Sequence, residues 1–513
     1  MTSKYHLTRA LVVALMGHVD HGKTTLLDSI CDKNITSSEA GGITQNTRAH
    51  QTIFEEQKIT FIDTPGHEAF SRMRSRGAKV TDIVLLVVAA DDGVQPQTKE
   101  SIKFAQEQKV PIIVAINKTD IPGKNLTKIK QELTDAGLHL EEYGGDVMAI
   151  EISALKKKGL DDLLNRILLL AEMSEFKVEK VKDVIGRVFV LEASLDNDRG
   201  PVALCKVKAG QVKQGDYLVY KGGSGKIRNV LNTEQKEIKE AVQGDPVWLV
   251  GMNKVLDTGE IVEVVADEKQ AKLFLKGIEN GVVLAESLEI AKETVDDLEM
   301  LSGLLETDKQ DKQIKFLNVI LKTDVQGTLE AVKDQLLDLN DEEVKIKILK
   351  EGTGKITEED ILTAKNSRGI VIGFQVHMDK HVEDVAHKEK VLVKIYKVIY
   401  DLIQELSEAM DSMMAPQYIE TEIARATIRK VFTLTNGKIV AGAFVEKGNI
   451  VKGSKVNVIR KEEKMGEGKI ASLKILKQEV KEAKKGVECG ILIEPVVIVK
   501  KGDQIVCIKM EQI

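Results

Sequence analysis

Residues 17–24 read Gly-His-Val-Asp-His-Gly-Lys-Thr, and this stretch constrains the fold more than any other part of the chain. It fits the pattern G-x-x-x-x-G-K-[ST], in which a glycine-rich loop leads from a buried strand into a helix and wraps phosphate groups. The apolar run Leu11–Met16 precedes the loop as such a strand would, and the helix-like run Thr24–Ile30 follows it. The context therefore favours a phosphate-binding loop over a chance match.

The residue types in this loop suit phosphate and metal binding. Gly17 and Gly22 allow a tight turn that aims backbone N–H groups inward. Lys23 would bring a positive charge to the β- and γ-phosphates of a nucleotide, and the Thr24 hydroxyl would reach a Mg²⁺ ion. The N-terminus of the following helix adds to the attraction for the anion.

Length and cysteine usage limit the class of protein. A chain of 513 residues is too long for one core, and about three to five domains are expected. No stretch approaches the roughly 18 consecutive apolar residues of a membrane span, and residues 1–10 lack the apolar core of a signal peptide. The four cysteines, Cys31, Cys205, Cys489 and Cys507, form no CxxC pair. Their spacing favours reduced thiols in the cytoplasm and argues against a zinc site of the usual type.

The net charge of −6 hides an asymmetry between the two ends of the chain. Residues 421–513 carry 19 Lys and Arg against 11 Asp and Glu, so the remainder of the chain is strongly acidic. A basic C-terminal part favours a polyanionic partner, most simply nucleic acid. The alternative is a lysine-rich solvated surface, and charge does not separate the two.

Residues 9–174 alternate apolar strand-like runs with helical ones, which is typical of a doubly wound α/β domain. In such a domain ligands bind at the carboxyl ends of the strands. The expected strands are Leu11–Met16, Ile59–Asp63, Ile83–Ala89, Pro111–Asn117 and Val147–Ser153.

The rest of the chain predicts five further parts. Short strand-like runs punctuated by glycines indicate a β-barrel at 180–268, and an acidic helix-prone connector follows at 269–312. Alternation returns in 315–397, which predicts a small α/β domain with a parallel sheet. A long linker helix at 398–416 then leads to a second barrel at 422–513.

The two predicted barrels resemble each other in sequence. Lys208–Gly215 and Glu446–Gly453 have similar glycine spacing, and a Gly-containing turn follows each at 242–245 and 484–487. An internal repeat is slightly favoured over turn chemistry that small barrels share without common descent.

Asp63-Thr64-Pro65-Gly66-His67 follows the second predicted strand of the first domain. Asp63 is a candidate for holding Mg²⁺ through water, and Gly66 can bring its N–H to the γ-phosphate because no Cβ blocks the approach. Release of the segment on loss of that phosphate would make it a switch loop. The alternative, an ordinary surface turn, is disfavoured because the segment follows a phosphate-binding loop.

His67 is the candidate catalytic residue, because hydrolysis of a γ-phosphate needs a group that orients the attacking water. Thr44, after two glycines, is a further candidate Mg²⁺ ligand beside Thr24 and Asp63, although a threonine in a polar loop is also unremarkable chemically.

Asn117-Lys118-Thr119-Asp120 follows the fourth predicted strand and indicates guanine as the base. A carboxylate at Asp120 can accept from both N1–H and the 2-amino group of guanine, whereas adenine offers neither donor there, and such sites reject analogues strongly. Ser153-Ala154-Leu155 can supply a backbone N–H to guanine O6. The predicted nucleotide-binding residues are Gly17, His18, Val19, Asp20, His21, Gly22, Lys23, Thr24, Thr25, Asp63, Thr64, Pro65, Gly66, His67, Asn117, Lys118, Thr119, Asp120, Ser153, Ala154 and Leu155.

Together and in this order, the motifs resemble those of the translational GTPases, and finer matches resemble the family of bacterial-type translation initiation factor two. The finer matches are Ala40–Gln45, Asp63–Phe70, Val87–Val94, Leu191–Asp196, Arg199–Val202, Asp324–Glu330, Tyr396–Leu402 and Glu488–Gly490. The resemblance runs from about residue 10 to the end. It implies an α/β P-loop GTPase domain followed by a β-barrel, a helical connector, a small α/β domain, a linker helix and a C-terminal β-barrel.

The resemblance implies a cytoplasmic, ribosome-stimulated GTPase that uses GTP, GDP and Mg²⁺. Its expected partners are the small and large ribosomal subunits, formylmethionyl initiator tRNA and other initiation factors, and the expected state is a monomer that does not bind membranes. The implied tRNA-binding residues in the last barrel are Lys474, Lys477, Glu488, Cys489 and Gly490.

The chain departs from the family pattern at several places. Ile475 stands where an arginine is usual, Ala443 stands where a cysteine is frequent, and only about ten residues precede the first strand where many members carry a long extension. Ile475 and Ala443 predict an altered affinity and selectivity of the tRNA pocket, and ribosome contacts made by an extension would be missing. A buried small hydrophobe is the alternative interpretation of Cys489. Two other functions remain open: an elongation-type carrier of aminoacyl-tRNA, and a ribosome- or RNA-binding protein that does not hydrolyse its nucleotide.

Overall fold

The computed structural model describes residues 5, 7–32, 43–122, 125–174, 176, 178, 181, 183–279, 315–341, 343–413, 418–433, 439–460, 463–476, 478–495, 497 and 499–512. The chain divides into two compact units, Met1–Met413 and Met414–Ile513. No helix of the described residues is long and apolar enough to cross a membrane.

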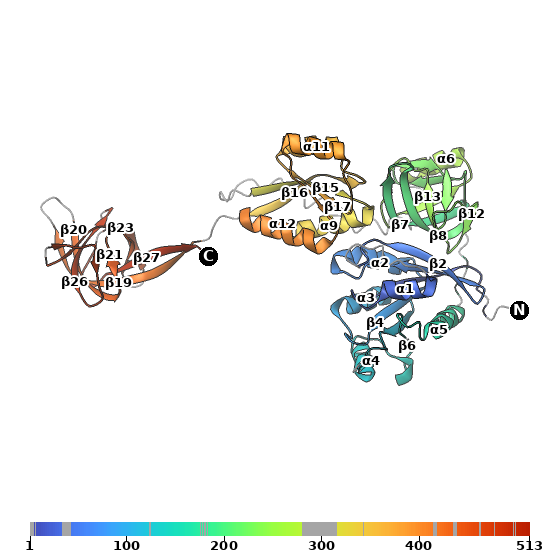
Figure 1. The fold of residues 1–513 in the computed structure, drawn as a ribbon, viewed down its shortest axis with the longest axis horizontal. Helices are drawn as coiled ribbons and strands as arrows, with labels where there is room; N and C mark the ends of the chain where they lie inside the picture. The colour runs from blue at the N-terminus through green and yellow to red at the C-terminus, as the bar shows by residue number, and fades with distance from the viewer. Residues whose placement is uncertain are drawn as a thin grey trace. The chain divides into compact units, whose positions relative to one another are not determined.

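The first domain is a six-stranded sheet in the order β2-β3-β1-β4-β5-β6, covered by helices on both faces (Figure 1). All its neighbouring strands are parallel except β2 and β3. Its strands are β1 Leu11–Met16, β2 Arg48–Phe54, β3 Gln57–Asp63, β4 Ile83–Ala89, β5 Ile112–Asn117 and β6 Met148–Glu151. Its α-helices are α1 Lys23–Cys31, α2 Ser71–Lys79, α3 Pro96–Glu107, α4 Leu126–Asp135 and α5 Leu160–Met173.

Alternation along the central strands fills both faces of this sheet. From β1, Val13 and Leu15 pack in a core with residues of α1 and α5, while Ala14 and Met16 pack in a second core with residues of α2, α3 and α4. The doubly wound prediction is confirmed, and the five expected strands are all present. The edge strand β2 was not among the predicted strands, because its polar, half-buried residues give no apolar run.

The next domain is a β-barrel in the order β10-β9-β14-β7-β8-β13-β11, with β12 paired to β8. Its strands are β7 Gly186–Asp196, β8 Gly200–Lys213, β9 Tyr217–Tyr220, β10 Gly223–Lys226, β11 Asn229–Leu231, β12 Glu240–Val242, β13 Pro246–Val250 and β14 Ile261–Val265. Val12 and Ile62 of the first domain share a buried cluster with Phe189 and Leu204 of this barrel. The two domains therefore have a common core at their junction. Helix α6, Glu268–Glu279, begins the predicted connector, whose remainder lies outside the described residues.

A four-stranded parallel sheet in the order β16-β15-β17-β18 forms the small α/β domain (Figure 1). The linker helix α12, Ile399–Met413, follows directly. The domain's elements are β15 Lys315–Thr323, α9 Gln326–Asp338, β16 Val344–Thr353, α10 Glu358–Ser367, β17 Ile370–Phe374, α11 Lys380–Glu389 and β18 Val393–Tyr396. Helix α11 was not predicted, because its many charged residues leave only a narrow apolar stripe around Val382 and Ala386.

The second unit is a β-barrel in the order β22-β27-β19-β20-β26-β23-β24, closed by pairing of β22 with β23. Its strands are β19 Tyr418–Thr433, β20 Ile439–Gly448, β21 Ile450–Val451, β22 Lys455–Arg460, β23 Glu463–Ile475, β24 Gln478–Glu479, β25 Glu482–Ala483, β26 Glu488–Glu494 and β27 Gln504–Gln512.

The two barrels share their turn geometry as well as the order of their central strands. Gly210 and Gly448 have φ angles of 67° and 69°, in the left-handed region that favours glycine. The amide of Gly244 donates to Val207 O at 2.9 Å, and the amide of Gly486 donates to Val445 O at the same distance. The similarity noted in the sequence thus corresponds to matching turns in the two barrels.

Candidate nucleotide-binding site

The loop between β1 and α1 requires its two glycines. Gly17 has φ 138°, and a Cβ there would lie 2.3 Å from Val87 O on β4. Gly22 caps α1 with φ 84°, and a Cβ there would lie 2.5 Å from Nδ2 of Asn117. A side chain at either position would be strained, because the loop lies tightly against the ends of β4 and β5.

Lys23 is buried within this loop. Its Nζ donates to Gly17 O at 2.9 Å and to His18 O at 2.7 Å. Gly66 lies beside it, since a Cβ on Gly66 would be 2.6 Å from Lys23 Nζ and 3.0 Å from the Val19 nitrogen. The 63–67 loop therefore meets the phosphate-binding loop at the lysine ammonium. Thr64 anchors it by donating its hydroxyl hydrogen to Leu15 O at 2.8 Å.

Three candidate metal ligands from separate segments converge. The hydroxyl oxygens of Thr24 and Thr44 lie 2.7 Å apart, and Thr44 Oγ1 donates to Asp63 Oδ2 at 3.3 Å. Thr44 and Asp63 are buried. Two hydroxyls and a carboxylate are hard oxygen donors, and this donor set fits Mg²⁺ better than a soft metal.

Asn117 joins two loops of the site. Its Nδ2 donates to His21 O at 3.0 Å, and its Oδ1 accepts from the Ala154 amide at 3.0 Å. Because Asn117 is buried, loss of either bond would leave a polar group without water.

The candidate base-reading residue is oriented by a neighbour. Asp120 Oδ1 accepts from the Ser153 hydroxyl at 2.7 Å, and Oδ2 lies 3.9 Å from Lys156 Nζ. Thr119 Oγ1 donates to Ile152 O at 2.7 Å, and Lys118 Nζ lies 3.5 Å from Asp91 Oδ2. The sequence did not predict that the Ser153 hydroxyl would orient Asp120 or that the Asp91 carboxylate would lie near Lys118.

The side chain of His21 stabilises the phosphate-binding loop and does not face solvent. Its ring is buried, with Nδ1 3.2 Å from Val87 O and Nε2 3.0 Å from Asp92 Oδ2. Burial lowers the pKa of His21. The side chain thus packs the loop onto the end of β4, and its carbonyl carries the bond to Asn117. Leu155, the last of the predicted nucleotide-binding residues, is 77% exposed.

His67 is a largely buried neutral histidine. Burial, with a smaller contribution from the Arg74 guanidinium, lowers the pKa of His67. Its Nδ1 accepts from the Ala69 amide at 2.9 Å, so the proton of the neutral ring lies on Nε2. In this arrangement His67 can donate a hydrogen bond to a water but cannot use Nδ1 as a base.

Segments distant in sequence contact this site. The ring of His67 packs against Tyr400 of α12. Gln45 bonds the backbone before and within α12, with Nε2 donating to Lys397 O at 2.9 Å and Oε1 accepting from the Ile399 amide at 3.2 Å. Asn46 Nδ2 donates to Asp324 Oδ2 at 2.7 Å. No local pattern in the sequence signals these contacts.

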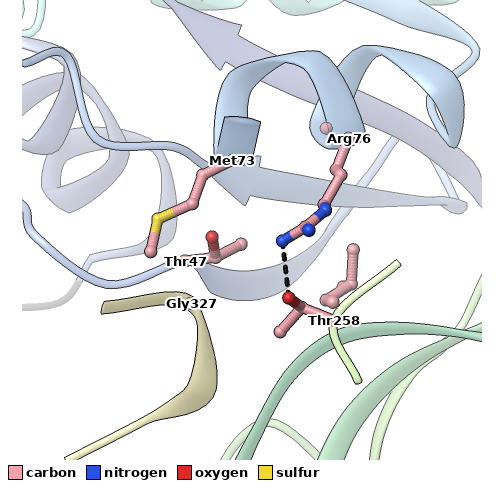
Figure 2. Close-up of a pocket in the computed structure, with 7 residues that line it drawn as sticks. Thr47, Met73, Arg76, Thr258 and Gly327 are labelled. Carbon is pink, nitrogen blue, oxygen red and sulfur yellow. Dashed lines mark hydrogen bonds between the residues drawn. The ribbon is translucent and has the colours of Figure 1, made fainter. Parts of the chain in front are cut away.

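A small pocket lies where the first domain, its barrel and the α/β domain meet (Figure 2). Arg76 of α2 donates to the Thr258 hydroxyl and lies 2.6 Å from Glu330 Oε2 of α9. The pocket is lined by Thr47, Met73, Arg76, Gly77, Leu191, Thr258 and Gly327. These residues lie at the contact between domains. None of them belongs to the predicted nucleotide-binding residues.

The residues implied for tRNA binding lie on adjacent strands of the second unit. Lys474 of β23 pairs with Gly490 of β26, and Cys489 pairs with Ala443 of β20. Cys489 packs in the barrel core, and burial raises its pKa to about 11. Lys477 lies outside the described residues. The thiol is therefore a core group here, while Lys474 and Glu488 are exposed.

A contact next to this set was missed by sequence reasoning. Arg429 of β19 stacks over the Phe444 ring at 4.1 Å and pairs with Glu488 Oε1 at 2.7 Å. A cation on an aromatic face beside Glu488 gives this patch both charge and a stacking surface.

Comparison with known families matches three parts of the chain. Residues 8–173 match the model "Elongation factor Tu GTP binding domain", residues 186–265 match "Elongation factor G domain 2", and residues 291–407 match "Translation-initiation factor 2". The first domain is thus a GTP-binding domain of the translational GTPase type.

Whole-chain relatives carry the description "Translation initiation factor IF-2". The chain is 45% identical over 505 residues to that of Pelotomaculum thermopropionicum, covering 98% of this chain and 51% of the relative. It is 44% identical to that of Halothermothrix orenii, covering 97% of this chain and 71% of the relative. It is 43% identical to that of Thermoanaerobacter sp., covering 98% of this chain and 72% of the relative. The chain spans about half the length of the first of these relatives.

Proposed function

The chain belongs to the translation initiation factor IF-2 family, and on that premise we propose that it is a GTP-hydrolysing initiation factor of the cytoplasm. In this role it binds formylmethionyl initiator tRNA, promotes its placement on the small ribosomal subunit and promotes joining of the large subunit. Hydrolysis of GTP then releases the factor. The observation that carries the proposal is the convergence of Thr24, Thr44 and Asp63, because three separate segments bring together oxygen donors of the kind that Mg²⁺ prefers.

In the proposed complex, the loop 17–24 wraps the phosphates and Lys23 exchanges its bonds to Gly17 O and His18 O for bonds to phosphate oxygens. Thr24, Thr44 and Asp63 would hold Mg²⁺, and the ion would supply positive charge against the phosphates of the nucleotide. Asp120 reads the guanine base, and Asn117 keeps the base-binding and phosphate-binding loops in register.

His67 is the proposed residue that orients the attacking water. Its lowered pKa keeps the ring neutral near pH 7, and Nε2–H can donate to the water oxygen. Orientation of this kind suits phosphoryl transfer, in which the transition state is loose and needs little proton abstraction.

The C-terminal barrel is the proposed tRNA-binding part. Its excess of Lys and Arg supports contact with the phosphate backbone, and this contact would weaken with salt. Lys474, Glu488 and the backbone of Gly490 form the proposed pocket, with Arg429 and Phe444 beside it.

Two measurements test the proposal. GTP hydrolysis by the full chain is measured alone and with both ribosomal subunits, and we expect strong stimulation by the assembled ribosome. Lack of hydrolysis in both cases would favour the non-hydrolysing alternative. Binding of formylated and unformylated methionyl-tRNA is then compared, and preference for the formylated form is expected. Equal binding would favour an elongation-type carrier.

A further inference from the structure

Arg74 is a fully buried arginine for which the proposed function has given no role. It lies on α2, and Nη1 donates to Pro65 O at 3.1 Å and to His67 O. Nη2 pairs with the Glu100 carboxylate of α3. Burying a guanidinium is costly unless its partners are well placed, and an apolar side chain could fill the space between two helices at lower cost.

The two carbonyls that Arg74 holds flank Gly66. The Pro65 carbonyl belongs to the same trans peptide unit as the Gly66 amide, and the C=O and N–H of one such unit point in opposite directions. Arg74 therefore turns the Gly66 N–H away from α2. Gly66 lies beside Lys23 Nζ and the Val19 nitrogen, where the phosphates are proposed to bind.

The other face of α2 has a separate task. Figure 2 shows Met73 and Arg76 directed toward the junction with Thr258 and Gly327. Arg72 pairs with Asp334 of α9 at 2.9 Å and is largely exposed. The side chains of Arg72 and Arg76 thus bond to other domains, whereas the side chain of Arg74 bonds to the 63–67 loop. The effect of Arg74 on that loop is therefore separable from domain docking.

Glu100 anchors the arginine. One carboxylate oxygen accepts from Arg74 and the other accepts from the Ser71 hydroxyl, so both ends of the carboxylate are fixed to α2. Because the guanidinium is a planar fork, this anchor sets the direction of the bonds from Nη1. A lysine at this position would retain the charge but not the fork.

We propose that Arg74, anchored by Glu100, is a positioning residue that aims the Gly66 N–H at the γ-phosphate and places His67 for GTP hydrolysis. This inference rests on the proposed function. It adds that recognition of the γ-phosphate and orientation of the water depend on one buried side chain. The charge of Arg74 also contributes to the lowered pKa of His67.

The test uses the full chain with Arg74→Lys, and Glu100→Gln as a second variant in case the first fails to fold. Arg72→Lys on the same helix is the matched control. Affinities for GTP and GDP are measured separately. GDP has no γ-phosphate, so its binding should not depend on the Gly66 N–H. We expect GTP affinity to fall by about tenfold with GDP affinity nearly unchanged, which corresponds to the loss of one charge-assisted donor. Ribosome-stimulated hydrolysis at saturating GTP should fall by about 100-fold, as for a misplaced catalytic group.

A double-mutant cycle with His67→Ala separates positioning from general destabilisation. If Arg74 acts through His67, Arg74→Lys should slow hydrolysis little further in the His67→Ala background. Fully additive losses, or equal weakening of GTP and GDP binding, would overturn the inference. If the unaltered chain does not hydrolyse GTP on ribosomes, the proposed function fails instead, and the ratio of GTP to GDP affinity still decides the role of Arg74 in aiming Gly66.

Discussion

The imidazole ring of His67 packs edge-on against the phenol ring of Tyr400, with the ring centroids 4.3 Å apart. His67 lies in the 63–67 loop, and Tyr400 lies in the first turn of the linker helix α12. Gln45 bonds the backbone on both sides of the start of the same helix. The residue proposed to orient the attacking water is therefore partly covered by the helix that leads to the C-terminal barrel.

Removal of this cover should change the titration of His67. Burial is the larger cause of its lowered pKa, so Tyr400→Ala should raise the pKa toward the ordinary value of 6.5. Histidine-selective NMR titration measures this shift, with His67→Ala used to assign the resonance. Tyr400→Phe keeps the ring and should leave the pKa nearly unchanged. An unaltered pKa in Tyr400→Ala would contradict a contribution of α12 to the burial of His67.

His67→Ala should bind GTP normally and hydrolyse it slowly. Groups that act on the attacking nucleophile contribute about 100-fold or more, so ribosome-stimulated turnover should fall by at least this factor. The measurement is single-turnover phosphate release at saturating ribosomes. His139→Ala, at an exposed position in the same domain, is the control. Turnover close to that of the unaltered chain would remove His67 from catalysis.

Asp120→Asn should change the choice of base. The amide can no longer accept from both guanine donors, while xanthine presents a carbonyl where guanine has its amino group. GTP affinity should fall by roughly 100-fold or more, with a relative gain for xanthosine triphosphate. Competition binding with both nucleotides gives the ratio, and the exposed Asp135→Asn is the control. If GTP affinity does not change, Asp120 does not read the base.

Glu192 should make stability depend on pH. It is buried at the junction beside Gly327, whose amide donates to its Oε1 at 2.8 Å, and burial raises its pKa to about 8. Asp324 and Glu330 add to this shift, and burial also raises the pKa of Asp324. Because the folded pKa lies above the unfolded value of 4.5, the folded state binds more protons in this window. Its stability should then fall as pH rises from about 4.5 through about 8.

Thermal and denaturant unfolding at the two ends of that pH range test this expectation. Glu192→Gln should lose less stability than the unaltered chain as pH rises, by the order of a few kcal/mol at the alkaline end. Glu240→Gln changes an exposed glutamate of the same barrel and should behave like the unaltered chain. Parallel pH profiles for all three proteins would show that Glu192 ionises normally in the folded state.

The motifs around Thr24, Asp63, Asn117 and Ser153 could be recognised in the linear chain because each follows a strand of the same sheet. Parallel strands end at the same edge of a sheet, so Thr24, Asp63, Asn117 and Ser153 had to come together once those strands were identified. Gly17 and Gly22 were equally informative, since their positive φ angles are conformations that other residues rarely adopt. The polar edge strand β2 and the charged helix α11 could not be predicted, because their hydrophobic periodicity is weak.

Contacts between segments that are distant in the sequence could not be predicted in this way. The stacking of Tyr400 on His67, the bonds from Gln45 to α12 and the burial of Arg74 between α2 and α3 all depend on how separate elements pack. Periodicity and motif spacing report the conformation of a segment and the face it buries, because both arise from neighbours within a few residues. Which other surface covers that face depends on shape and charge matching across the whole unit, so these partners appear in the folded chain and have no signature in the order of its residues.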